Sequence, residues 1–164
     1  MESEAVLRKE LLALLHGGNA HMSFDQAVAD FPLEAMNTRP PQVSYTPWHL
    51  LEHLRITQWD ILEFIRNPAH VSPDWPVGYW PALDAQADQA IWETTIRRFR
   101  LDLSALEDMA RDPNLPLTKS LPHAPGYTIF RELVLVGDHN AYHIGEFAIL
   151  RQVMGTWPAA RSGN

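Results

Sequence analysis

Histidines spaced four residues apart are the feature of this sequence that most clearly suggests chemistry. One pair, His49 and His53, lies in PWHLLEHLR, and a second, His139 and His143, lies in GDHNAYHIGEF. Residues four apart on an α-helix lie one above the other on the same face. Two imidazoles so placed can reach one metal ion at about 2.0–2.1 Å, and a third ligand must then come from another helix. The two pairs therefore predict a metal site between two helices.

The second pair lies on a polar strip of an otherwise apolar segment. At about 100° per residue, Glu132, His139, His143 and Glu146 share one narrow face of a helix. Most other positions of the segment are apolar, and a helix that is apolar nearly all round is buried. We therefore expect the strip in or beside the interior, where polar groups must be paired. A metal would pair several of them at once.

In the first pair, His53 is the better candidate for the third ligand. It lies at the edge of the apolar arc of its helix, whereas His49 lies about 40° further out and is expected to lean toward solvent. The predicted metal ligands are His53, His139 and His143. Three imidazoles with an open position are typical of a metal that does chemistry.

Several alternatives stay open at this level. Such His pairs also occur as solvated or core-packed motifs. The bundle would then be structural or partner-binding, with the polar strip internally hydrogen-bonded. Glu146 could orient an imidazole N–H as a hydrogen-bond acceptor, act as a weak ligand, or be a surface charge. Glu132 is expected to be structural. Imidazole suits several divalent metals, so zinc, nickel, iron and manganese are not distinguished.

Four long helices are predicted to position these residues. Their expected ranges are 3–16, 47–66, 84–111 and 129–154. Thr46 is a good N-cap with Pro47 in the first helical position, and Thr128 caps the last helix. No segment shows sustained β alternation. The prediction is an all-α four-helix bundle that forms a single domain over residues 1–164.

Long connectors rich in Pro and Trp separate these helices. Ser23 and Gln26 fit a capping box at the start of a short helical turn. Residues 68–83 contain four prolines and three aromatic residues, and we expect an ordered loop over one end of the bundle. Its aromatic residues either line the mouth of a pocket or anchor the loop on the bundle.

The remaining histidines are weaker candidates. His16 is expected to cap the first helix, and His21 and His70 are expected to be exposed. His123 would reach the site only if its loop folded inward.

Composition excludes several classes of function. The net charge of −7 without a Lys/Arg run argues against nucleic-acid binding. The absence of Cys excludes thiolate ligands, Cys nucleophiles and disulfides within the chain. The N-terminus lacks the basic start of a signal peptide, and no apolar run approaches the roughly 18 residues of a membrane span. We therefore expect a soluble, cytoplasmic protein that does not bind membranes.

The two His segments also resemble a known family. TPWHLLEHLRITQWDIL, followed about ninety residues later by DHNAYHIGEFAILRQVMG, is similar to the DinB-like family of DinB/YfiT-like metalloenzymes. The resemblance covers nearly the whole chain. It implies a four-helix bundle of unusual connectivity, often dimeric, whose divalent metal is bound by residues that correspond to His53, His139 and His143. His49 is a departure from the usual pattern.

The resemblance also implies a chemistry. Some relatives are metal-dependent transferases or isomerases that use a low-molecular-weight thiol such as bacillithiol or mycothiol, and others are known only as stress-induced proteins. A coordinating thiol is deprotonated, and the thiolate is the nucleophile. The resemblance therefore predicts a homodimeric, metal-dependent thiol transferase acting on a small-molecule substrate. The alternative is a non-catalytic metal-binding or stress-response bundle.

Overall fold

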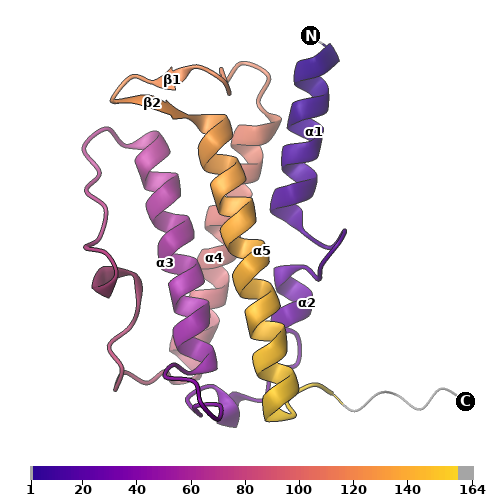
Figure 1. Cartoon of the computed structure of the whole chain (residues 1–164), viewed down its shortest axis with the longest axis vertical. Coiled ribbons are helices and arrows are strands. Elements are labelled where there is room, and N and C mark those ends of the chain that lie inside the picture. Colours follow the sequence, from indigo (N-terminus) through magenta and orange to yellow (C-terminus); the bar gives the residue numbers. More distant parts are fainter. Residues whose placement is uncertain (1, 159–164) are drawn as a thin grey trace, which may run out of the picture.

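The chain folds into a bundle of four long helices (Figure 1). The computed structural model describes residues 2–158. The long helices are α1 (Glu2–His16), α3 (Pro47–Arg66), α4 (Gln89–Arg111) and α5 (Ile129–Met154). The predicted all-α four-helix bundle is confirmed, and no helix of the described part is long and apolar enough to cross a membrane.

The order of the helices around the bundle differs from their order along the chain. α3 packs against α4 and α5, and α1 packs against the same two helices. α1 and α3 therefore occupy one diagonal of the bundle, and α4 and α5 the other. α1 and α3 follow one another in the chain but lie across a diagonal, as do α4 and α5. A tight turn cannot join them, and this explains the long connectors of residues 17–46 and 112–128.

Local capping chemistry sets the boundaries of α3 and α5. The Thr46 hydroxyl accepts the backbone N–H of His49 at 3.2 Å, and the Nδ1 atom of His49 accepts that of Thr46 at 3.4 Å. At the start of α5, the Thr128 hydroxyl accepts the backbone N–H of Arg131 at 3.1 Å. At its other end, Gly155 has a φ of 63°, a left-handed conformation that Gly adopts without steric cost. Both helices span the predicted residues.

The start of α4 was predicted five residues too early. The helix begins at Gln89 with Asp88 as its N-cap, whose carboxylate accepts the Ile91 N–H at 2.8 Å. The preceding backbone is used elsewhere: both the N–H and the carbonyl of Ala87 are hydrogen-bonded to the Asn37 side chain. These distant partners compete with the helix, and the local sequence does not reveal them.

Short elements fill the connectors. They are α2 (Phe24–Val28), the 3₁₀ helices η1 (Leu33–Ala35) and η2 (Val77–Tyr79), and the strands β1 (Ser120–Leu121) and β2 (Ala124–Thr128). The capping box of Ser23 and Gln26 is present at α2. The antiparallel β1–β2 hairpin was not predicted, because strands this short carry no recognisable alternation.

The connector of residues 67–88 follows the length of α3. In Figure 1, α3 and α4 run in the same direction, so the chain must return along the bundle between them. Its residues meet α3 in reverse order: His70 bonds to Asp60, and the carbonyl of Ala85 bonds to His49. We expected this loop over one end of the bundle, and that position was wrong, because the loop lies along α3.

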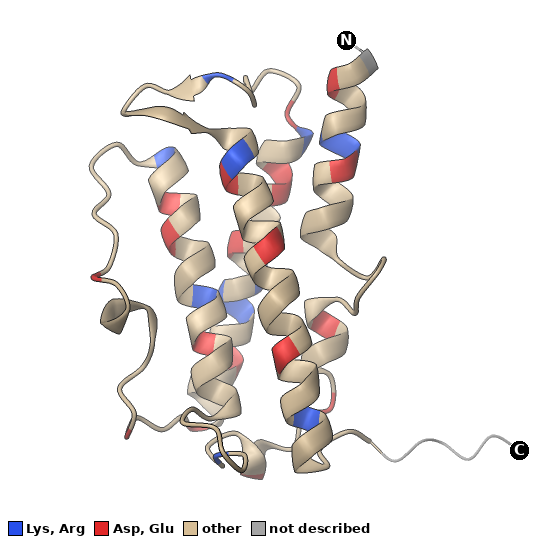
Figure 2. Cartoon of the chain, viewed as in Figure 1, with Lys and Arg blue, Asp and Glu red and all other residues tan. Residues whose placement is uncertain are grey.

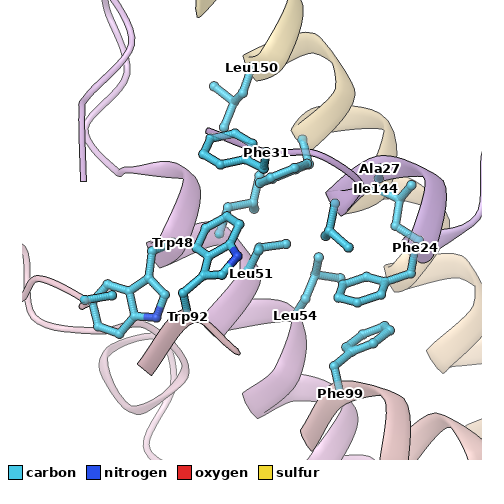
Figure 3. Packing of buried hydrophobic residues seen from close by; sticks show 14 residues of the cluster. Phe24, Ala27, Phe31, Trp48, Leu51, Leu54, Trp92, Phe99, Ile144 and Leu150 are labelled. Carbon is cyan, nitrogen blue, oxygen red and sulfur yellow. The ribbon is translucent and has the colours of Figure 1, made fainter. Parts of the chain in front are cut away.

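The interior has two apolar clusters separated by a polar layer. The first cluster, around Phe24, Phe99 and Phe147, is shown in Figure 3, with the Phe24 and Phe99 rings stacked at 3.9 Å. The second cluster includes Leu11 of α1 and Val136 of α5, which pack with apolar residues of α3 and α4. A hydrogen bond of 2.9 Å from Asn140 to Gln58 joins α5 to α3 between them.

Helix α5 is less buried than its composition predicts. Five of its large apolar side chains are more than a third exposed: Val134, Leu135, Tyr142, Ile149 and Val153. The polar strip instead faces α3, so apolar residues are left on the solvent side.

Candidate metal centre

Three imidazoles from α3 and α5 converge on one point. The Nε2 atom of His53 lies 3.2 Å from Nε2 of His143 and 3.2 Å from Nε2 of His139. Ligand atoms of all three residues lie within 4.8 Å of one another. In a tetrahedral site with bonds of about 2.0–2.1 Å, ligand nitrogens are separated by about 3.3 Å. The observed spacing suits a single ion.

Hydrogen bonds on the far side of two rings determine which nitrogen carries the proton. Nδ1 of His53 lies 2.9 Å from the carbonyl oxygen of Tyr79, and Nδ1 of His143 lies 2.6 Å from the Glu146 carboxylate. Both partners can only accept, so each Nδ1 donates its proton. In the neutral rings, both Nε2 atoms therefore present lone pairs to one another across 3.2 Å. Such a contact is repulsive unless a cation lies between the nitrogens, and a divalent metal fits this requirement.

Burial keeps two of these rings neutral. It lowers the pKa of His139 to about 3, and the neighbouring His143 and His53 act in the same direction. Burial also lowers the pKa of His53, despite the opposing hydrogen bond to the Tyr79 carbonyl. A metal ligand must be deprotonated, so neutral rings at pH 7 are ready to bind.

Glu146 orients His143 as a hydrogen-bond acceptor. Burial alone would raise the pKa of Glu146, but hydrogen bonds from His143 and Tyr45 hold it below its usual value. Burial and this carboxylate together raise the pKa of Tyr45, so its hydroxyl stays a donor. Of the three roles considered for Glu146, the structure shows the orienting one. Such outer contacts fix the orientation of a ligand imidazole and increase its basicity.

Aromatic side chains lie beside two of the three rings. Trp80 stacks on His53 with ring centroids 4.0 Å apart and planes 5° apart. The Tyr142 ring lies edge-on to the His143 ring, with centroids 4.8 Å apart. The centroids of the Tyr45 and Trp80 rings are 5.3 Å apart. Trp80 therefore anchors the connector directly on the site.

His49 is structural, and its predicted orientation was wrong. Only 1 % of its surface is exposed. Its Nε2 lies 2.9 Å from the Ala85 carbonyl, and its Nδ1 takes part in the α3 capping box. The connector covers this face of α3, which a helical wheel of the single helix treats as solvent.

Other histidines lie away from the three rings. The side chain of His70 is only 7 % exposed and binds Asp60, so its expected exposure was wrong. His123 contacts the Phe64 carbonyl at 2.7 Å. The roles of Tyr45 and of the Tyr79 carbonyl were not predicted. Neither residue forms a motif with the histidines, and any residue type can supply a backbone carbonyl.

Comparison with known proteins places the chain in a family. The sequence model of the DinB superfamily matches residues 18–147. The chain belongs to the DinB superfamily. The match includes all of α3 and α5 as far as Phe147, and therefore all three imidazoles, so the expected family resemblance is confirmed. No curated protein and no solved structure matches this DinB superfamily chain.

We expect the metal-free protein to lose stability in mild acid. The pKa of His139 is about 3 in the folded chain but near 6.5 when unfolded, so below about pH 6.5 the unfolded chain binds the proton first. The loss grows until the pH reaches the folded value. At pH 5, protonation of His139 in the unfolded chain lowers the free energy of unfolding by at most about 2 kcal/mol.

Urea unfolding of chelator-treated protein between pH 7 and pH 5 measures this effect. The His139→Gln variant should show a shallower dependence of unfolding free energy on pH. Equal slopes for the two proteins would contradict the assignment.

Proposed function

We propose that this protein binds one divalent metal ion through His53, His139 and His143. The observation that carries the proposal is the approach of the His53 and His143 Nε2 atoms to 3.2 Å while both Nδ1 protons are engaged elsewhere. Three imidazoles leave at least one coordination position for an external ligand. Zinc, nickel, iron and manganese are all compatible with this donor set.

We further propose that the external ligand is a low-molecular-weight thiol and that the protein is a metal-dependent transferase. A divalent metal at this site would hold the thiol as its thiolate. The chain has no Cys, so any thiolate here comes from a second molecule. Glu146 would keep His143 oriented, and Trp80 would hold His53 and shield it from water.

A non-catalytic metal-binding or stress-response role is the second candidate. It uses the same three imidazoles, and the Trp80 ring stacked on His53 would then restrict access to the ion instead of shaping a substrate site. Only turnover separates the two candidates.

The metal site is tested by elemental analysis of protein purified without a His tag. We expect about one equivalent of metal in the wild type and its loss in His139→Ala, because two rings rarely hold an ion alone. His123→Gln is the matched control, since His123 binds the Phe64 carbonyl. Unchanged metal content in His139→Ala would reject the site.

The thiol proposal is tested with Co²⁺-loaded protein. A panel of small thiols should produce thiolate-to-metal absorption in the near ultraviolet, and the signal should be absent in His139→Ala. Product formation from electrophiles in the presence of that thiol, and its loss with a chelator, would support the transferase. Thiol binding without turnover would favour the non-catalytic candidate, and the absence of any spectral change would contradict thiol use.

We also propose that the protein forms a homodimer through the outer face of α5. Leu135, Tyr142 and Ile149 are seven residues apart and exposed, so they line one face of the helix. Between Val134 and Val153, Asp138 is the single charged residue among the exposed positions of α5. In Figure 2, most of the α5 ribbon is tan, the colour of residues other than Lys, Arg, Asp and Glu, and it is interrupted by red and blue bands. An apolar helix face of this kind suits the same face of a second copy.

Light scattering during size exclusion tests the dimer. We expect twice the chain mass for the wild type and a monomer for Ile149→Glu, because a buried unpaired carboxylate is costly. Val71→Glu is the control, since Val71 is an exposed apolar residue of the connector. A monomeric wild type at tens of micromolar would contradict the proposal.

A further inference from the structure

A buried carboxylate ties the connector of residues 67–88 to α3. Asp60 is 7 % exposed, and both of its oxygens are engaged. Oδ1 lies 2.7 Å from Nε2 of His70, and Oδ2 accepts the Tyr79 hydroxyl at 2.6 Å. Burial of a carboxylate is costly unless such partners replace its water. The connector therefore supplies the groups that Asp60 needs.

Tyr79 links this carboxylate to the metal site. Its side chain reaches Asp60, while its backbone carbonyl accepts the Nδ1 proton of His53 at 2.9 Å. The next residue, Trp80, stacks on the same imidazole. Asp60 and His53 are seven residues apart, so they lie two turns apart on one face of α3. The Tyr79–Trp80 segment spans the distance between them.

The Tyr79 hydroxyl is the donor in its hydrogen bond with Asp60. Burial and the neighbouring Asp60 raise the pKa of the Tyr79 hydroxyl to about 12, so it remains protonated and donates. The hydroxyl thus has a fixed partner at one end of the residue, and the carbonyl has a fixed partner at the other. One residue therefore connects the Asp60 carboxylate to Nδ1 of His53.

We propose that Asp60 is a positioning residue for the metal site. By holding Tyr79, it keeps a carbonyl against Nδ1 of His53, and this selects the tautomer that presents the Nε2 lone pair to the ion. The inference rests on the proposed metal site, but Asp60 itself touches none of the three imidazoles. His70 supports the same carboxylate from the start of the connector.

A merely structural anchor would behave differently. It would lower the free energy of unfolding without altering the tautomer of His53 or the affinity for metal. Thr95 provides a matched comparison, because its buried hydroxyl donates to Glu52 at 2.7 Å and accepts from Trp48 at 3.3 Å. This network joins α4 to α3 and does not include the connector.

The test compares Tyr79→Phe and Asp60→Asn with Thr95→Val. Tyr79→Phe keeps the ring and the carbonyl and removes only the hydroxyl. Loss of an outer contact to a ligand typically weakens metal binding roughly 10- to 100-fold. Because Asp60 acts through Tyr79, we expect about the lower value for Co²⁺ in both variants, with an altered visible spectrum. Thr95→Val should keep wild-type affinity and spectrum at a similar loss of stability.

A second measurement does not depend on metal. Imidazole ¹⁵N shifts of the metal-free wild type should show His53 protonated at Nδ1, and the two variants should show a mixture of tautomers. Wild-type ¹⁵N shifts and Co²⁺ affinity in Tyr79→Phe would overturn the positioning role, even if Asp60→Asn fails to fold. A wild type that binds no Co²⁺ but shows the variant-dependent tautomer shift would instead count against the metal function alone.

Discussion

The parallel direction of α3 and α4 forces the connector that joins them to run back along the bundle, and one side of the candidate metal site is built on that connector. α3 and α4 pack side by side and run in the same direction (Figure 1). α3 has 20 residues, about 30 Å at the rise of an α-helix, so the connector must cover that distance. It does so against α3, where it buries His49, engages Asp60 and places Tyr79 and Trp80 on His53. A sharp turn between these helices would leave His53 without either contact.

Burial of neutral imidazoles links the stability of the protein to its chemistry. The environment that lowers the pKa of His139 and His53 also brings their Nε2 atoms within 3.2 Å. Among the described residues, the buried side-chain atoms without a hydrogen-bond partner include Nδ1 of His139, Oδ1 of Asn140, Oγ1 of Thr57 and Nε of Arg151. One of these atoms, Nδ1 of His139, belongs to the three imidazoles, so this ring lacks the outer hydrogen bond that His53 and His143 have.

The three imidazoles have unequal support. His143 is backed by an ionised carboxylate that Tyr45 holds in place, and His53 is backed by a neutral carbonyl. A carboxylate partner increases the basicity of an imidazole more than a carbonyl does. The rings are thus expected to differ as donors, and an external ligand would meet an asymmetric centre with aromatic walls.

The features that could be predicted from the amino-acid order are those whose causes lie within a few residues of one another. The caps at Thr46 and Thr128, the stop at Gly155 and the i, i+4 spacing of His139 and His143 are local, and the structure retains all of them. Contacts between distant segments of the folded chain explain the burial of His49, the late start of α4 and the partners of His53 and Asp60. Each of these depends on hydrogen bonds between residues that are distant in the chain, many of them to backbone carbonyls, and neither periodicity nor composition records such contacts.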